Sequence, residues 1–149
     1  ANSIANFKGY FDCFKKNLAL LPNQTLHFEL GRSLVAQCGS LIARVLYIKP
    51  AERTSFMVLD AGMTELIRPA LYRSFHFIEN LSSQEGSVVY DVVGPICETS
   101  DAFARGLSLP ETKRGDMLAI RSAGAYGEVM ASQYNLREVA PSIFSDDFK

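Results

Sequence analysis

A thiol and a carboxylate stand next to each other at Cys97 and Glu98, in the stretch Cys97-Glu98-Thr99-Ser100-Asp101. The stretch follows an apolar run that ends in Gly94-Pro95-Ile96, so both groups would lie at the end of a strand, where a site is well placed. A neutral thiol, with a reference pKa of about 8.5, can donate a proton at neutral pH. Cys97 is therefore a candidate proton donor. The alternative is a small buried residue beside a solvated acidic loop.

Two arginine motifs have the chemistry to hold anions. In Glu29-Leu30-Gly31-Arg32 a glycine stands where a strand is expected to end and a helix to begin, which would turn backbone N–H groups and a partial positive charge toward a phosphate. Arg32 adds a planar fork for a carboxylate or a phosphate. In Arg68-Pro69-Ala70-Leu71-Tyr72 a guanidinium and a phenol are four residues apart, so a locally helical backbone would put both on one face, where they could grip one anion. The alternatives are a loop with a solvated arginine, and a surface arginine beside a core tyrosine.

Small residues surround one tyrosine in Ser122-Ala123-Gly124-Ala125-Tyr126-Gly127. They would let the backbone approach a flat ligand closely, with the ring or the hydroxyl of Tyr126 placed against it. The alternative is a tight turn with a packed aromatic ring. Each of these clusters says little when it is taken alone.

The composition indicates a folded protein, because the 149 residues are 48% hydrophobic and contain no low-complexity run. The net charge of -1 gives no sign of a nucleic-acid or membrane partner. The two histidines stand alone and the three cysteines are widely spaced, so no metal site is expected. The N-terminus lacks the features of a signal peptide, and the odd number of cysteines then indicates reduced thiols in a cytoplasmic protein, with Cys13 and Cys38 in the core.

These side chains need elements to position them, and the N-terminal segment is expected to supply one α/β unit. Aromatic and leucine residues at three- and four-residue spacing predict an amphipathic helix over residues 6–21. A short buried strand over residues 25–30 follows, and a second helix of about two turns then begins at Gly31, with Ser33 as its N-cap. Because one such unit cannot close a sheet, the segment is predicted to be a piece of something larger.

After Gly39 the sequence changes to short apolar strands separated by Gly, Pro and Asp turns. Strands are predicted over residues 41–48, 55–60, 87–93, 117–122 and 133–139, a pattern typical of an antiparallel barrel or sandwich. Residues 66–77 are ambiguous, because Pro69 argues against an uninterrupted helix there. The change of character predicts a boundary between an α/β part at residues 1–38 and a β domain at residues 39–149.

Together, in this order and spacing, the clusters resemble the C-terminal part of the fold-type III pyridoxal-phosphate decarboxylases, and most closely the diaminopimelate decarboxylases. The resemblance runs from about Phe7 to Arg137. Its most specific parts are Asp60-Ala61-Gly62-Met63, Arg68-Pro69-Ala70-Leu71-Tyr72, Val93-Gly94-Pro95-Ile96-Cys97-Glu98 and Gly124-Ala125-Tyr126. It implies that residues 1–38 are the remnant of the last unit of a cofactor-binding (β/α)8 barrel. It also implies that residues 39–149 form an antiparallel Greek-key β-barrel or sandwich similar to the C-terminal domain of alanine racemase.

The resemblance further implies a homodimer with active sites at its interface, and pyridoxal 5′-phosphate as the cofactor. Glu29, Gly31 and Arg32 would belong to the phosphate-binding turn after the last barrel strand. Gly31 would meet the phosphate through its backbone, Arg32 would reach the substrate, and Tyr126 would touch both cofactor and substrate. In such enzymes the cofactor stores electrons, while the protein supplies position, charge and a proton.

The substrate that the resemblance implies is meso-2,6-diaminopimelate, which is converted to L-lysine and carbon dioxide in lysine biosynthesis. Arg68 and Tyr72 match the positions that hold the carboxylate of its non-reacting end, and Glu98 matches the position that pairs with the distal ammonium. Cys97 matches the thiol that reaches the neighbouring subunit's site and protonates the carbon that carbon dioxide has left.

No lysine of the chain lies in a context that resembles the family's cofactor-anchoring lysine; the six are Lys8, Lys15, Lys16, Lys49, Lys113 and Lys149. The family's glycine-triplet phosphate loop is also missing, so the chain by itself is expected to be inactive. Two alternatives stay open: a decarboxylase acting on carboxynorspermidine, ornithine or arginine, and a non-catalytic dimerisation module. Ornithine-type enzymes prefer an aspartate after the cysteine and need no arginine–tyrosine clamp, so Glu98 with Arg68 and Tyr72 favours a dicarboxylic diamine.

Overall fold

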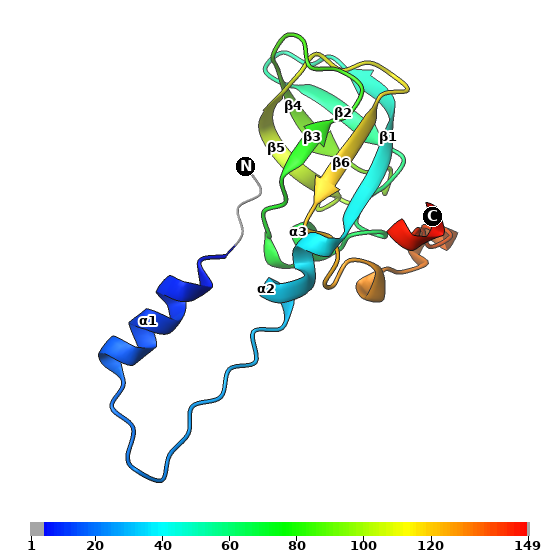
Figure 1. The fold of residues 1–149 in the computed structure, drawn as a ribbon. Helices are drawn as coiled ribbons and strands as arrows, with labels where there is room; N and C mark the ends of the chain where they lie inside the picture. The colour runs from blue at the N-terminus through cyan, green and yellow to red at the C-terminus, as the bar shows by residue number, and fades with distance from the viewer. Residues whose placement is uncertain (1–4, 149) are drawn as a thin grey trace.

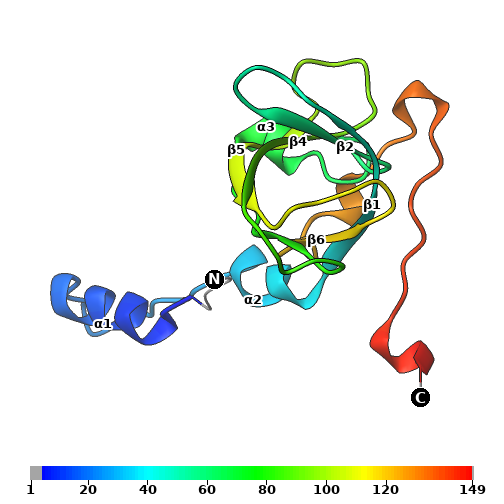
Figure 2. The same ribbon diagram turned by 90° about the horizontal axis from the view of Figure 1, so that it is seen from above.

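A computed structural model describes residues 5–148, which fold around one six-stranded sheet of order β3-β6-β1-β2-β4-β5. The strands are β1 (Ser40–Lys49), β2 (Ser55–Leu59), β3 (Ile78–Asn80), β4 (Val88–Val93), β5 (Ala102–Leu109) and β6 (Met117–Arg121). Viewed from above, the sheet curls into an almost closed barrel (Figure 2). The expected mainly β domain is therefore confirmed, with one difference from an all-antiparallel barrel, because β2 and β4 pair in parallel.

Alternating apolar side chains of the strands fill the inside of the barrel. Met57, Leu59, Val92, Leu118 and Ile120 have no measurable exposure. Burying one such side chain contributes about 1.5–3 kcal/mol to folding, so this interior is the main source of the stability that holds the loops around it.

Two strands of the barrel were not predicted from the sequence. β3 has only three residues, and β5 contains Gly106, which takes a left-handed backbone conformation with φ +61°. The Gly106 N–H donates to the carboxylate of Asp91 on β4 at 2.7 Å, beside an irregularity in the pairing of β4 with β5. A bulged strand loses the strict two-residue alternation of side chains that identifies a strand in a sequence.

Two strand predictions are wrong. Residues 25–30 are extended but are not part of a sheet, because no neighbouring strand lies beside them among the described residues, and a strand needs a partner for its backbone hydrogen bonds. In place of a strand over residues 133–139, the structure has the short 3-10 helix η3 (Tyr134–Leu136). The expected α/β unit is therefore reduced to helices joined by an extended segment.

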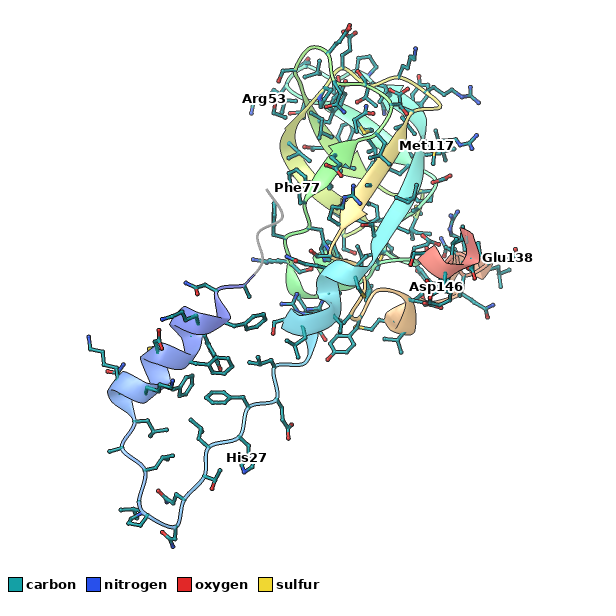
Figure 3. All side chains as sticks on the ribbon, viewed as in Figure 1. His27, Arg53, Phe77, Met117, Glu138 and Asp146 are labelled. Atoms are coloured by element: carbon teal, nitrogen blue, oxygen red, sulfur yellow. The ribbon has the colours of Figure 1, made fainter. Side chains whose placement is uncertain are left out.

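The N-terminal helix α1 (Phe7–Asn17) lies apart from the barrel, at the far end of a long connection that carries His27 (Figures 1 and 3). Asn6 caps it by accepting the Gly9 N–H at 2.9 Å. Its aromatic face meets one ring of the extended segment: the rings of Tyr10, Phe11 and Phe14 lie 4.9–5.8 Å from that of Phe28. None of the residues of α1 is buried, so this face has no core to pack against.

The second helix is as long as predicted but begins differently. It consists of α2 (Arg32–Val35) followed by the 3-10 helix η1 (Ala36–Cys38). Gly31, and not Ser33, is its N-cap, while the Ser33 hydroxyl donates to the Leu30 carbonyl at 2.9 Å. The expectation that Cys13 and Cys38 are core residues is wrong, because both thiols are exposed.

The ambiguous residues 66–77 contain one short helix, α3 (Arg68–Tyr72), with Pro69 in its first turn, where a missing N–H costs no helical hydrogen bond. Figure 1 shows α2 and α3 at the same end of the barrel. The C-terminal part adds η2 (Glu128–Met130), η3 and η4 (Ser145–Phe148) outside the barrel. Within residues 5–148, no helix has the length and apolar character needed to span a membrane.

Candidate active site

Gly31 and Tyr126 lie next to each other where α2 begins. Gly31 has φ +50°, a conformation that favours glycine, and a Cβ at this position would meet only the Tyr126 hydroxyl, at 3.5 Å. Tyr126 itself is 43% exposed. The backbone of this turn is therefore open on the side of the phenol, and a ligand can approach both.

The small residues before Tyr126 allow a close contact with α2 and η1. The N–H groups of Ala123 and Gly124 donate to the carbonyls of Gly39 and Ala36, both at 2.9 Å. A Cβ on Gly124 would lie 2.5 Å from the carbonyl oxygen of Val35. The close neighbour of Gly124 is thus the helix and not a ligand, and the contact places Tyr126 beside Gly31.

The structure brings Arg68 and Tyr72 together on α3. The guanidinium carbon of Arg68 lies 4.9 Å from the centre of the Tyr72 ring, which fixes the guanidinium by a cation–π contact. The Nε atom of Arg68 is buried and has no hydrogen-bond partner in the described residues. A buried donor without a partner is uncommon, and a carboxylate is a good match for a guanidinium. The pair is therefore ready to receive an anion.

His76, for which no role was predicted, is buried close after α3. It is 4% exposed; its Nδ1 donates to the Arg121 carbonyl at 2.9 Å, and its Nε2 accepts from the Ser74 hydroxyl at 3.1 Å. Burial lowers the pKa of His76 below its usual 6.5, and the charges of Arg68 and Arg32 lower it further. The positive charges of both arginines therefore act on the His76 ring, although α2 and α3 are far apart in the sequence. This end of the barrel suits an anionic ligand.

Cys97 and Glu98 are exposed in the loop between β4 and β5. The Tyr134 hydroxyl donates to Glu98 Oε1 at 2.6 Å. This hydrogen bond, with the negative charge of Glu98 and a smaller effect of Cys97, raises the pKa of the Tyr134 phenol. Glu98 and Tyr134 line an open pocket of about 280 Å³, whose other walls are Met63, Thr64, Ile67, Ser100 and Ser132.

Sequence reasoning missed Tyr134, because residues 133–139 were predicted to form a strand. Two contacts hold this segment in place: the Ser132 N–H donates to the Thr64 carbonyl at 2.9 Å, and the Arg137 guanidinium binds the carbonyl of Asp60. Arg137 also lies 3.6 Å from Glu65, which is 8% exposed. All these partners are distant in sequence, so no local signal could have found Tyr134.

Asp101 differs from the alternative considered for the cluster at Cys97, in which the acidic loop is solvated. Its side chain is 4% exposed and accepts two backbone N–H bonds. Burial raises the pKa of the Asp101 carboxyl, while the N–H groups of Ile96 and Met63 partly oppose that effect.

The predicted site residues thus form three local groups. Gly31 and Tyr126 meet at the start of α2, and Arg68 and Tyr72 meet on α3. Cys97 and Glu98 lie in the β4–β5 loop beside Tyr134, where Glu98 shares a pocket with Ile67, the residue before α3. Glu29 is exposed on the extended segment before Gly31. Across residues 5–148 there is no cluster of three or more His, Cys, Asp and Glu side chains that could hold a metal ion.

Comparison with known proteins points to one family. A family model described as "Pyridoxal-dependent decarboxylase, C-terminal sheet domain" matches residues 11–124. The chain is 57% identical to a diaminopimelate decarboxylase of Bacteroides thetaiotaomicron, over 97% of this chain and 38% of that protein. The chain therefore spans only about 38% of the length of this relative.

Solved structures agree with the family model. The crystal structure of diaminopimelate decarboxylase from M. jannaschii in complex with L-lysine matches with a TM-score of 0.72 and 38% identity, over 87% of this chain and 29% of that one. A lysine/ornithine decarboxylase from Vibrio vulnificus, complexed with cadaverine, matches with a TM-score of 0.67 over 73% of this chain and 30% of that one. At 22% identity, this second likeness concerns the fold alone.

Proposed function

Since the chain belongs to the pyridoxal-dependent decarboxylases, as their C-terminal sheet domain, we propose that it completes the active site of a diaminopimelate decarboxylase. The full-length enzyme would convert meso-2,6-diaminopimelate to L-lysine and carbon dioxide. The observation that carries this substrate is the Arg68–Tyr72 pair, which presents a buried, unpartnered guanidinium nitrogen beside an exposed phenol. A substrate with a second carboxylate is the kind of ligand that such a pair selects.

The residues near Gly31 fit a phosphate-bearing pyridoxal group. The turn is open where a side chain would stand, the Tyr126 hydroxyl borders the same space, and Arg32 adds a positive charge. We assign the phosphate to the Gly31 backbone, with Glu29 and Arg32 on either side of the turn. When bound, pyridoxal phosphate takes up the electron pair released as the bond to the leaving carboxylate breaks.

Arg68 and Tyr72 would hold the distal carboxylate of the substrate, and Arg32 and Tyr126 would contact the substrate near the cofactor. His76 supports this arrangement, because both of its ring nitrogens are hydrogen-bonded and the charges of Arg68 and Arg32, together with burial, lower its pKa and so oppose a further positive charge there. The substrate would thus be held at both ends, which orients the carboxylate that leaves.

Cys97 and Glu98 would serve the site of the neighbouring subunit in a homodimer. Glu98 would pair with the distal ammonium, and the Cys97 thiol would deliver a proton to the carbon that carbon dioxide has left. Both side chains are exposed on the surface of the chain, which supports this assignment, because a second copy can reach them. The pocket beside Glu98 is open at the surface.

We further propose that residues 1–38 belong to the cofactor-binding barrel and that the chain alone is inactive. The aromatic face of α1 packs its rings on Phe28, and no residue of the helix is buried, as expected for a helix whose other neighbours lie elsewhere in a larger protein. The five lysines among the described residues are all exposed, unlike a lysine that is buried where it anchors a cofactor. Three free, exposed thiols suit the cytoplasm, where we place the enzyme.

The test is an assay of the full-length enzyme for L-lysine formation from meso-diaminopimelate, with carboxynorspermidine, ornithine and arginine as competing substrates. We expect only diaminopimelate to be turned over efficiently, and we expect the 149-residue chain alone to hold no dialysis-resistant absorbance of bound pyridoxal phosphate. Faster turnover of one of the other substrates would overturn the assigned specificity. A full-length protein that binds no cofactor would favour the dimerisation module instead.

A further inference from the structure

We propose that Asp101 is a positioning residue that holds the loop of residues 94–101, and with it Cys97 and Glu98, in the place that substrate engagement requires. This inference rests on the proposed function of these two residues. It adds a residue that neither touches the substrate nor was expected to be buried.

The Asp101 carboxylate joins two turns of the chain. Its Oδ1 accepts the Met63 N–H at 2.6 Å, and its Oδ2 accepts the Ile96 N–H at 2.7 Å. Met63 belongs to the turn after β2, whereas Ile96 directly precedes Cys97. Each oxygen is therefore used by a different turn, and the loop is fixed to the barrel by a charged acceptor with 4% exposure.

Two glycines make room for this carboxylate. A Cβ on Gly94 would lie 2.4 Å from Asp101 Oδ2, and a Cβ on Gly62 would lie 2.7 Å from Asp101 Oδ1. Any side chain at either position would push the carboxylate out of its place. Gly62 is held in turn by Glu65, whose Oε2 accepts the Gly62 N–H at 2.7 Å.

The loop itself is closed by backbone hydrogen bonds that end on Asp101. The Gly94 N–H donates to the Asp101 carbonyl and the Asp101 N–H donates to the Glu98 carbonyl, both at 3.1 Å. The Glu98 N–H donates to the Ile96 carbonyl at 2.8 Å. Cys97 and Glu98 therefore sit at the tip of a small closed loop, and its attachment to Met63 sets the direction in which they point.

The test compares Asp101→Asn with Asp116→Asn in the full-length enzyme. Asp116 is a matched control, because it is 6% exposed and also accepts a loop N–H, that of Lys113 at 3.0 Å, in a different turn. An asparagine at 101 keeps the shape but can accept only one of the two N–H bonds, since its amide nitrogen is a donor. Hydrogen–deuterium exchange and the kinetics of diaminopimelate decarboxylation are measured on both variants.

We expect Asp101→Asn to speed exchange within residues 94–101 and at Met63, while the amides of the sheet keep their protection. The KM for meso-diaminopimelate should rise about tenfold or more, since a charge-assisted hydrogen bond is lost, and it should stay near the wild-type value in Asp116→Asn. A merely structural role would lower the number of active sites and hence the maximal rate, leaving KM unchanged. An unchanged KM, or exchange that speeds equally across the sheet, would overturn the proposal.

Gly62→Ala provides a second route if Asp101→Asn does not fold, because the added methyl displaces the carboxylate without removing it. It should give the same exchange pattern and the same rise in KM, and wild-type values for both would overturn the proposal. Glu98→Gln distinguishes a failure of the proposed function of Glu98 from a failure of the positioning role of Asp101. If that variant keeps the wild-type KM, the proposed function fails, while exchange at Met63 and Ile96 still decides whether Asp101 holds the loop.

Discussion

Replacing Arg68 by glutamine removes the guanidinium whose buried Nε lacks a partner while keeping a side chain of similar length. A hydrogen bond to a charged group contributes about 1.5–3 kcal/mol, so losing the contact with the distal carboxylate should lower kcat/KM for meso-diaminopimelate about 10- to 160-fold. The cation–π contact with Tyr72, 4.9 Å away, is lost as well, but at a partly exposed position this costs only about 0.5–1 kcal/mol of stability. The effect should therefore appear in catalysis and hardly in folding.

The assay uses two inhibitors that differ only in the carboxylate that Arg68 is proposed to bind. L-Lysine keeps that carboxylate, whereas cadaverine lacks it. Arg68→Gln should weaken inhibition by L-lysine by the same factor as it lowers kcat/KM, and it should change inhibition by cadaverine less than about twofold. Arg68→Lys should fall in between, because an ammonium keeps the charge but not the planar fork.

Arg53→Gln is the control for a general change of charge, since Arg53 lies on the β1–β2 loop at the opposite end of the barrel from α2 (Figure 3). It should leave both inhibitors unaffected. Equal weakening of L-lysine and cadaverine by Arg68→Gln, or an unchanged kcat/KM, would refute the assignment of Arg68 to the distal carboxylate.

Three further predictions concern the site and the barrel. Tyr134→Phe removes the hydroxyl that orients Glu98, so the KM for diaminopimelate should rise severalfold with kcat unchanged, and a wild-type KM in steady-state kinetics would contradict this role. Burial, and then the charges of Arg68 and Arg32, lower the pKa of His76 in the folded protein below 6.5. As the pH falls, the unfolded chain therefore binds a proton at His76 before the folded chain does. The stability that the neutral ring contributes is present above pH 6.5 and is lost as the pH falls through the lower pKa of the folded state. Thermal unfolding from neutral to mildly acidic pH should show this loss in the wild type and a smaller one in His76→Gln, and equal slopes would count against it. Leu118→Ala should lower the free energy of unfolding in urea by about 2–5 kcal/mol because Leu118 is fully buried, whereas Leu136→Ala, at a position 98% exposed, should change it by less than about 0.5 kcal/mol.

The comparison of Asp101 with Asp91 shows how similar carboxylates serve different purposes in this fold. Asp91 accepts the Gly106 N–H at 2.7 Å and pairs with Arg105 on the outside of the sheet, so it stabilises a bulge between two strands. Asp101 bridges two loops at the site and is more deeply buried. A carboxylate that accepts backbone N–H groups is therefore informative about function only when the segments it joins are known.

The sequence alone located most of the barrel, because an alternating apolar strand of five or more residues is a local pattern. β1, β2, β4 and β6 were predicted within one or two residues, whereas the bulged β5 and the three-residue β3 were missed. The same local reasoning predicted a strand over residues 25–30, and failed because a strand forms only when a neighbour accepts its backbone hydrogen bonds.

In the candidate site, too, the contacts between residues close in sequence could be predicted, and those between distant residues could not. The four-residue spacing of Arg68 and Tyr72 is enough to bring them onto one face of a helical turn. Cys97 and Glu98 are neighbours because they are consecutive in the sequence. Neither the proximity of Gly31 to Tyr126 nor the hydrogen bond between Glu98 and Tyr134 could be read from the sequence. These contacts join residues 95 and 36 positions apart, and only the closing of the barrel, driven by burial of side chains such as Met57 and Leu118, brings such distant segments together.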